Sequence, residues 1–303
     1  MKKILVIYYS QSGQLKRVID SFTSKLANEN ICVDYKKIVP KKAYPYPWSF
    51  YEFFDEFPES VYLDGCEVNE LDNLDSEYDL IILGYTIWFL SPSLPITGFL
   101  KTQQAKELFK DKPVITLVAC RDMWVMAQEK MKQLLKNVDA KLIDNVVLTD
   151  QGKSIYTFFT TPRWLLTGKK NAFAFFPAAG ISEEEITNAS RFGERIKNNI
   201  ETLNSLKYNS LLKNIGAVNV NGKLIATEKI ATKSFKIWGK LIKFAGDKYS
   251  FNRKVVITIY AVFLIALILT VVPLNIFIRK LLSPFQKEKI KELENYYELP
   301  SGR

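Results

Sequence analysis

The sequence contains no histidine, and its three cysteines, Cys32, Cys66 and Cys120, are widely spaced and form no C-x-x-C pair. Without imidazole the chain cannot form a Ser-His-Asp triad, a Cys-His dyad, a two-histidine zinc site or a histidine pH switch. The odd number and wide spacing of the cysteines predict neither a disulfide framework nor a zinc ribbon, and favour reduced thiols in the cytosol. We therefore expect no metal site, and any chemistry must use another proton carrier or a cofactor.

The chain of 303 residues has a net charge of +10, but its first two thirds carry almost none of it. Residues 1–205 hold 25 basic and 26 acidic side chains, whereas residues 206–303 hold 17 and 6, a net charge of +11. A nucleic-acid-binding protein with this charge would place its basic side chains in a recognisable module with stacking aromatic residues, and none is visible. We expect no nucleic-acid partner, so the basic third needs another explanation.

One long apolar run lies in this basic third. Val255–Ile278 contains 24 residues without a charged side chain. As a helix it would reach about 36 Å, which exceeds the ~30 Å hydrocarbon core of a bilayer. Basic pairs at 253–254 and 279–280 flank it, where cations sit at membrane interfaces. We expect 253–280 to form a membrane helix, either transmembrane or, because Pro273 can kink it, monotopic.

The segments on both sides of this run are also basic. We expect 206–252 to be a linker with an amphipathic helix, and 281–303 to be a charged tail. Lysines opposite an apolar face suit an anionic leaflet, although a helix packed on the soluble domain would show the same pattern. The apolar run near the start, ILVIYY, is too short for a typical signal peptide. We therefore expect a cytoplasmic catalytic domain anchored to the inner membrane by a C-terminal helix.

Residues 1–205 alternate between apolar runs and helix-like segments, which is typical of a doubly wound α/β domain. Ser182, followed by three glutamates, indicates the N-terminus of a helix that ends near Leu203. The apolar runs are continuous, as in strands buried on both faces. We predict a five-stranded parallel sheet with strands at Lys3–Tyr9, Ile31–Val39, Asp79–Tyr85, Pro113–Ala119 and Leu142–Leu148.

The loop after the first predicted strand is a candidate phosphate site, because ligands of such sheets bind at the carboxyl ends of the strands. It offers hydroxyl groups, a glycine and a following helix N-terminus. It has no cation before Lys16, and it matches neither the P-loop nor the G-x-G-x-x-G pattern. An ordinary capped turn could use the same residues. We expect a bound monophosphate at Ser10, Gln11, Ser12, Gly13, Gln14 and Leu15.

Two further loops, GYTIWFLSPSLPITGFL and VACRDMW, follow the third and fourth predicted strands. With the phosphate loop, they resemble the flavodoxin-like superfamily over roughly residues 1–205, specifically its quinone reductase and FMN reductase branch. The resemblance implies FMN as cofactor, with Trp88 the stacking residue. Leu15 and Tyr85-Thr86 depart from the usual residues at their positions. The implied ring contacts are Thr86, Ile87, Trp88 and Phe89 on one side, and Ala119, Cys120, Met123 and Trp124 on the other.

Two aromatic-rich insertions distinguish the chain from a short flavodoxin. Nine aromatic residues fall between residues 44 and 62, and seven more between 156 and 176. Long aromatic loops near a cofactor are usually lids or substrate walls, although extra core or a membrane-docking surface would also use such residues. Together with the membrane helix, the insertions indicate a lipophilic small-molecule substrate.

The opening KKILVIYYSQSGQL, the two further loops and the C-terminal apolar run also resemble the bacterial family labelled dialkylresorcinol condensing enzyme, over nearly the whole chain. The resemblance implies a role beside a ketosynthase, in which this flavoprotein aromatises a 2,5-dialkylcyclohexane-1,3-dione to a dialkylresorcinol. We do not expect condensation itself. A thiolase-like enzyme needs a nucleophilic cysteine served by histidine or asparagine, and this chain has no histidine. For contacts to the enol we expect Tyr85, Arg121, which could stabilise enolate charge, and Asp122, which could accept a proton.

Two other functions stay open from the sequence. One is a membrane-bound NAD(P)H:quinone reductase, and the other is a non-catalytic, membrane-tethered flavodoxin-like electron carrier. A carrier needs an exposed flavin edge, so the aromatic insertions favour an FMN-dependent oxidoreductase. The oligomeric state also stays open.

Overall fold

A parallel sheet forms the centre of the protein. The computed structural model describes residues 1–75, 77–205, 210–282 and 287–300. The sheet has the order β2-β1-β3-β5-β6, which is the flavodoxin-like order of the doubly wound fold. The predicted α/β fold is confirmed, and a short β4 (Ser91–Pro92) adds an antiparallel hairpin at the end of β3. The parallel strands are β1 (Lys2–Tyr8), β2 (Ile31–Lys37), β3 (Leu80–Trp88), β5 (Pro113–Cys120) and β6 (Lys141–Thr149).

Each face of the sheet is covered by helices, because successive strand residues point to opposite faces. Ile4 and Val6 of β1 pack in one core with the helices α1 (Gln14–Thr23), α8 (Glu183–Asn188) and α9 (Ser190–Asn198). Leu5 and Ile7 pack in the other core with α4 (Leu94–Phe99), α5 (Gln103–Phe109) and α6 (Val125–Asn137). Burial on both faces explains why the strands appear in the sequence as continuous apolar runs.

The helix predicted to run from Ser182 to Leu203 is divided into three parts. The predicted N-cap is confirmed, since Ser182 Oγ accepts a hydrogen bond from the Glu185 N–H at 3.2 Å. However, α8 ends at Asn188, α9 follows, and a 3₁₀ helix covers Ile200–Ser205. Gly193 lets α9 approach α1 closely, because a Cβ there would lie 2.0 Å from the Phe22 carbonyl oxygen.

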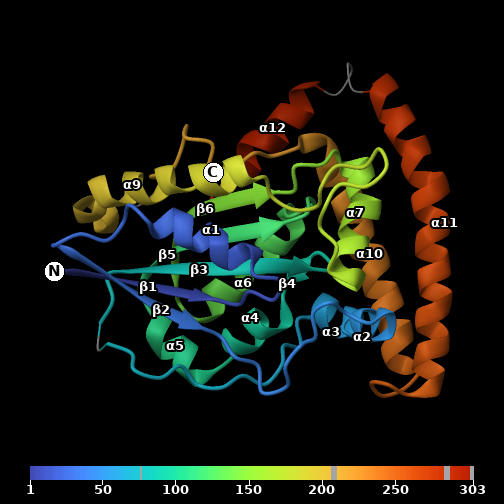
Figure 1. The fold of residues 1–303 in the computed structure, drawn as a ribbon, viewed down its shortest axis with the longest axis horizontal. Coiled ribbons are helices and arrows are strands. Elements are labelled where there is room, and N and C mark those ends of the chain that lie inside the picture. The colour runs from blue at the N-terminus through green and yellow to red at the C-terminus, as the bar shows by residue number, and fades with distance from the viewer. Residues whose placement is uncertain (76, 206–209, 283–286, 301–303) are drawn as a thin grey trace.

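The aromatic insertions are mostly helical, which corrects the expectation of long loops. The first forms α2 (Phe50–Asp55) and α3 (Phe57–Tyr62), and much of the second forms α7 (Ser154–Thr167). Ser49 Oγ caps α2 by accepting from the Glu52 N–H, and a proline in the first turn of α3 favours its start. Figure 1 shows these helices beside the edge of the sheet toward which the strand arrows point.

Much of the expected linker, 206–252, packs on the sheet domain. Ser210 Oγ and the Leu212 N–H donate to the Asp144 carboxylate, and the Val147 N–H donates to the Ala217 carbonyl. The amphipathic helix α10 (Gly222–Phe244) then packs on α3 and α6. The basic segment is therefore part of the folded body.

The expected membrane helix is α11 (Phe251–Leu282), which is continuous past position 273. Its stretch Phe251–Val271 is long and apolar enough to cross a membrane, and 17% of its most apolar window is buried inside the protein. Figure 1 shows α11 beside α10 at the outer side of the fold, with the final helix, α12 (Lys287–Glu298), turning back toward the sheet domain.

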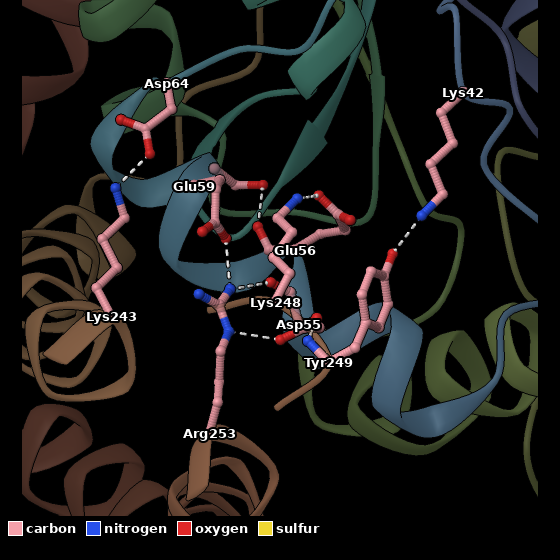
Figure 2. Close-up of polar contacts among 10 residues, drawn as sticks. Lys42, Asp55, Glu56, Glu59, Asp64, Lys243, Lys248, Tyr249 and Arg253 are labelled. Carbon is pink, nitrogen blue, oxygen red and sulfur yellow. Dashed lines mark hydrogen bonds and ion pairs between the residues drawn. The ribbon is translucent and has the colours of Figure 1, made fainter. Parts of the chain in front are cut away.

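A buried ionic cluster joins the start of α11 to α2 and α3 (Figure 2). Arg253 is 2% exposed; its Nε donates to Asp55 Oδ1 at 2.5 Å, and its Nη2 donates to Glu59 Oε2 at 2.8 Å. Beside it, Lys248 Nζ bonds Glu56 Oε2 at 2.7 Å, and the Tyr249 N–H donates to Asp55 Oδ2 at 3.0 Å. We call these contacts the Arg253 cluster.

The substitution Arg253→Ala tests this cluster. Loss of the guanidinium leaves the buried Asp55 and the partly buried Glu59 without their partner, so we expect the free energy of unfolding to fall by about 3–5 kcal/mol. Lys254→Ala is the matched control, because Lys254 is exposed and forms no salt bridge with a described residue. Urea unfolding of both detergent-solubilised variants measures the difference, and equal stabilities would show that the cluster does not hold α11.

Candidate functional site

The fold brings the three predicted loops together at the carboxyl edge of the sheet. β3 lies between β1 and β5, so the loops after these strands are adjacent. This edge is where doubly wound folds bind ligands, and in the flavodoxin-like order the switch point lies between β1 and β3. The candidate site is therefore built from the loops that follow β1, β3 and β5.

The loop after β1 has the geometry of an anion site. Gly13 adopts φ = +84°, a conformation that side chains with a Cβ rarely adopt, and α1 begins directly after it. The N-cap residue Gly13 has no side chain, so the N–H groups of Gln14 and Leu15 at the start of α1 are left for a ligand, whereas the Lys16 N–H is bound by Ser10. Ser10 Oγ accepts from the Lys16 N–H at 3.3 Å, which holds the loop against the helix, while Ser12 is exposed.

Two glutamines tie this loop to distant segments, Gln11 to the first insertion and Gln14 to the residues before α8. Gln11 Nε2 donates to the Pro45 carbonyl at 2.6 Å and its Oε1 accepts from Trp48 Nε1 at 3.2 Å, while Gln14 Oε1 accepts from the Ile181 N–H at 2.9 Å. Leu15 is buried in the core below α1. The side chains of Gln11, Gln14 and Leu15 therefore contact other parts of the protein. At these three positions a phosphate could bind only the backbone N–H groups.

The two insertions meet over the strand ends. Trp88 contacts Tyr44 and Trp48 edge to face, with ring centroids 5.0 and 5.5 Å apart. The backbone N–H of Trp48 donates to the Leu165 carbonyl of α7 at 2.9 Å, and Tyr46 packs edge to face on Trp164. We call Tyr44, Tyr46, Trp48, Trp88 and Trp164 the aromatic roof. Trp88, the expected stacking residue, is part of this roof and is 9% exposed.

The other residues expected after β3 take different positions. Phe89, at φ = +50°, packs on Phe53 and Phe57 of the first insertion. Ile87 is partly buried against the core shared with α6. Thr86 lies within β3, which extends three residues past the predicted strand end at Tyr85; its hydroxyl is buried and forms no hydrogen bond with a described residue, so a ligand at the end of β3 could satisfy it.

The loop after β5 is held by Asp122. Its Oδ1 accepts from the Met123 N–H at 2.8 Å, and its Oδ2 accepts from the Ser154 hydroxyl at the start of α7. Ala119 and Trp124 are buried in the two cores. Burial raises the pKa of the Cys120 thiol well above its ordinary value, so this cysteine stays protonated and is not a nucleophile. Asp122 therefore positions the loop.

Arg121 is the cation of the site. Its guanidinium lies 4.3 Å from the centre of the Phe158 ring, and its Nη2 lies 3.8 Å from Met123 Sδ. No carboxylate of the described residues forms a salt bridge with it. Burial lowers its pKa, and Asp122 and Asp150 oppose this shift, so the group stays charged near neutral pH. A partly buried guanidinium without an ion-pair partner can hold an anionic ligand.

Tyr85 is not at the site, which corrects its assignment as a substrate contact. Its side chain is fully buried in the core that α6 covers, and its hydroxyl donates to Gln128 Oε1 at 2.5 Å. Gln128 Nε2 in turn donates to Thr116 Oγ1 at 3.0 Å. Burial raises the Tyr85 pKa well above its ordinary value. The hydroxyl completes an internal network and does not face a ligand.

Several buried hydroxyl groups form no hydrogen bond with a described residue. Such a group costs about 1–3 kcal/mol when nothing satisfies it, so each can accept a ligand or a water as its partner. One lies at the end of β3 and one in the aromatic roof; two lie on α7, one precedes α4 and one is on α11. These groups are Thr86 Oγ1, Tyr46 OH, Thr160 Oγ1, Thr161 Oγ1, Ser93 Oγ and Tyr260 OH.

Glu228 is a site-supporting residue that the sequence analysis missed. It lies on α10 and is 1% exposed, and its carboxylate oxygens accept from the Val125 N–H at 3.2 Å and the Met126 N–H at 3.1 Å. It therefore caps α6, whose own N-terminus has no side-chain cap, directly after the Arg121 loop. The partners are about 100 positions apart in the chain, so no local sequence signal could reveal the contact.

A cavity of about 260 Å³ lies next to the aromatic roof. Tyr44 and Trp48 line it from the roof, and Lys248 and Tyr249 line it from the turn between α10 and α11. Cys66 and Glu56 complete its inner wall; burial raises the pKa of both groups. The cavity thus connects the roof with the basic third of the chain.

Comparisons with known proteins show only distant likeness. No family model and no curated protein matches the chain. A flavoprotein–FMN complex from Lactobacillus acidophilus shares 22% identity over 48% of this chain and 93% of its own, with a TM-score of 0.40. An archaeal flavodoxin shares 12% identity over 66% of this chain and 99% of its own, with a TM-score of 0.34. A flavone reductase shares 15% identity over 68% of this chain and 66% of its own, with a TM-score of 0.37. Because all three scores are below 0.5, the fold assignment rests on the strand order.

The substitution Glu228→Gln tests the contact between α10 and α6. Burial raises the Glu228 pKa from 4.5 to about 8, so the folded protein retains a proton that the unfolded chain loses in this range. The free energy of unfolding should therefore decrease as the pH rises from about 4.5 to about 8. We expect this decrease to be smaller in Glu228→Gln, by at most on the order of 5 kcal/mol.

Urea unfolding between pH 5 and 9 measures this effect. Glu129→Gln is the control, because Glu129 lies on α6 and forms only a partly exposed salt bridge with Lys132. If both variants kept the wild-type pH dependence, Glu228 would not be the group that titrates.

Proposed function

We propose that this protein is an FMN-dependent oxidoreductase that acts on a lipophilic substrate at a membrane surface. The observation that carries the proposal is the start of α1 after Gly13, where the N–H groups of Gln14 and Leu15 have no side-chain cap and which lies at the flavodoxin-like switch point beneath the aromatic roof. An uncapped helix N-terminus suits a phosphate, and the adjacent loops supply the aromatic and polar groups that suit a flavin ring.

The residues present fit FMN. The Ser10 and Ser12 hydroxyls and the N–H groups at the start of α1 would hold the phosphate, and the unpaired Thr86 hydroxyl and the loop after β5 would hold the polar edge of the ring. Trp88 would border the ring from the roof. When bound, FMN supplies an acceptor for two electrons, which no side chain of this chain supplies.

For the substrate we propose a 2,5-dialkylcyclohexane-1,3-dione, which the sequence resemblance supports. Its conversion to a dialkylresorcinol removes two electrons and two protons and makes the ring aromatic. The Arg121 guanidinium would stabilise the enolate oxygen, since no carboxylate of a described residue pairs with it. Asp122 holds this loop through Met123 and Ser154, so it positions Arg121.

The surroundings of the site support a lipophilic substrate. The cavity of about 260 Å³ lies between the aromatic roof and the α10–α11 turn, on whose two sides Phe244 and Phe251 are exposed. Half of the residues that line the cavity are charged, so the aromatic roof and these exposed phenylalanines, rather than the cavity, favour a substrate with alkyl chains. The substrate would come from a carbon–carbon bond-forming enzyme, for which we propose a ketosynthase partner.

The aromatic roof also helps to distinguish an enzyme from an electron carrier. A flavodoxin-like electron carrier exposes the edge of its flavin, whereas here two insertions cover the strand ends and contact each other through Trp48 and Leu165. This arrangement favours an enzyme. A membrane-bound NAD(P)H:quinone reductase is the second candidate, because the same covered site would also suit a lipophilic quinone.

An absorbance spectrum and an activity assay test the proposal. We expect detergent-extracted protein to be yellow, with flavin bands, and to convert a dialkylcyclohexanedione to the resorcinol without NAD(P)H. Rapid bleaching of the flavin by NADPH, together with no turnover of the dione, would instead identify a quinone reductase. Protein that stays colourless after incubation with FMN would refute both enzymes.

The substitution Arg121→Gln tests the anion-binding role. We expect kcat/KM for the dione to fall about 10²–10³-fold, because charge that develops on the substrate oxygen loses its partner. Arg163→Gln is the matched control: Arg163 also stacks on a ring, at 4.2 Å from Phe173, but its guanidinium is hydrogen-bonded to the carbonyls of residues 169 and 171. The flavin content of both variants should match the wild type, and equal rates would exclude Arg121.

A further inference from the structure

The helices before and after α11 contact the same sheet domain. Before it, α10 packs on α3 and α6 and caps α6 through Glu228. After it, α12 packs on the start of α10, where the Gly222 N–H donates to Glu294 Oε1 at 3.0 Å. Leu293 and Tyr297 also pack on the core shared with α6, and Pro300 is buried. Both ends of α11 are therefore held on one side of the protein.

The first half of α11 is itself held against the domain. The Arg253 cluster fixes its start (Figure 2). One and two turns later, Ile257 and Tyr260 are buried, and the Tyr260 ring stacks on Phe57 of α3 with centroids 4.6 Å apart. Trp238 of α10 also contacts Tyr260, at 5.3 Å. This side of α11 is a protein interface from Arg253 to Leu264.

The part of α11 beyond this interface is too short to cross a bilayer. The apolar residues after Leu264 end at Ile278, about 14 residues, which as a helix span about 21 Å. The hydrocarbon core of a bilayer is ~30 Å thick. A transmembrane α11 would need about 20 residues in the hydrocarbon core, so it would have to withdraw Tyr260 and Leu264 from α3 and α10 and lose the stacking on Phe57.

The faces of α10 and α11 that point away from the domain are apolar and exposed. On α11, Val255, Ile259 and Val262 recur at helical spacing on the face opposite Ile257 and Tyr260. On α10 the exposed apolar residues also recur at helical spacing, and exposed lysines accompany them, at positions 233, 236 and 240. The α10 residues are Ile230, Ile237, Leu241 and Phe244, the last 92% exposed.

We infer that α10 and α11 form a monotopic anchor, which inserts its exposed apolar faces into one leaflet of an anionic bilayer, and that α11 does not cross the membrane. The inference rests on the membrane location in the proposed function. Apolar stripes accompanied by lysines are the pattern of helices that lie in the interface plane. The net charge of +11 on residues 206–303 favours an anionic leaflet. The aromatic roof then lies close to the membrane surface, where alkyl chains reside.

Cysteine labelling of the full-length protein tests the topology. Two variants carry Cys66→Ser: one retains the native Cys32, which is exposed on the sheet domain, and the other replaces Cys32 with Ser and carries Lys291→Cys on the exposed side of α12. Cys120 is buried in both. A membrane-impermeant maleimide is applied to right-side-out spheroplasts and to inverted inner-membrane vesicles.

We expect both sites to react in the inverted vesicles and to react at least tenfold less in spheroplasts. Labelling of Lys291→Cys from spheroplasts, while Cys32 reacts only in inverted vesicles, would show that α11 crosses the membrane and would overturn the inference. Glu288→Cys repeats the measurement one turn away on α12. Opposite-side labelling with a yellow, active protein would refute only the topology, whereas a colourless, inactive protein with same-side labelling would refute only the proposed function.

Discussion

The ion pairs of Arg253 with Asp55 and Glu59 are the interaction on which the arrangement of the protein depends. A guanidinium in an apolar helix is costly to bury, so it must lie where its two carboxylates are. These carboxylates lie on the first aromatic insertion, and this insertion also contacts Phe89 at the end of β3. The Arg253 cluster thus connects the apolar helix α11, through α3, to the edge of the sheet where the candidate site lies.

The site is consequently assembled from distant parts of the chain. The phosphate-type loop supplies a helix N-terminus, but Gln11 binds it to the first insertion, Gln14 binds it to Ile181 before α8, and Glu228 of the basic third caps the helix after the Arg121 loop. The C-terminal third is therefore a structural part of the site. This arrangement gives the segments added to the flavodoxin-like strand order a structural role: the insertions cover the binding edge, and the C-terminal third packs on α3 and α6.

The predictions that succeeded depended on local patterns. The five strands were found because burial on both faces makes each one a continuous apolar run, and the Ser182 cap because its hydrogen bond spans three residues. The assignments that failed depended on where a side chain points. Tyr85 lies near the end of β3, but the pleat directs it into the core toward Gln128. The insertions were expected to be long aromatic loops, yet they contain helices, and those of the first insertion, α2 and α3, pack on α11 and α10.

The sequence by itself determined the sheet, its binding edge, the candidate cofactor loops and the presence of one helix suited to a membrane, since each is encoded in a run of neighbouring residues. Only the tertiary structure decided which polar groups are free to bind a ligand. Among the described residues the Asp122 carboxylate and the Tyr85 hydroxyl are hydrogen-bonded, whereas Arg121 has no carboxylate partner and the Thr86 hydroxyl has no hydrogen bond, and these partners are set by contacts between distant segments. It also decided the position of α11. Hydrophobicity shows that a helix can enter a membrane. Whether it can also cross the membrane depends on the segments before and after it, and here both contact the same domain.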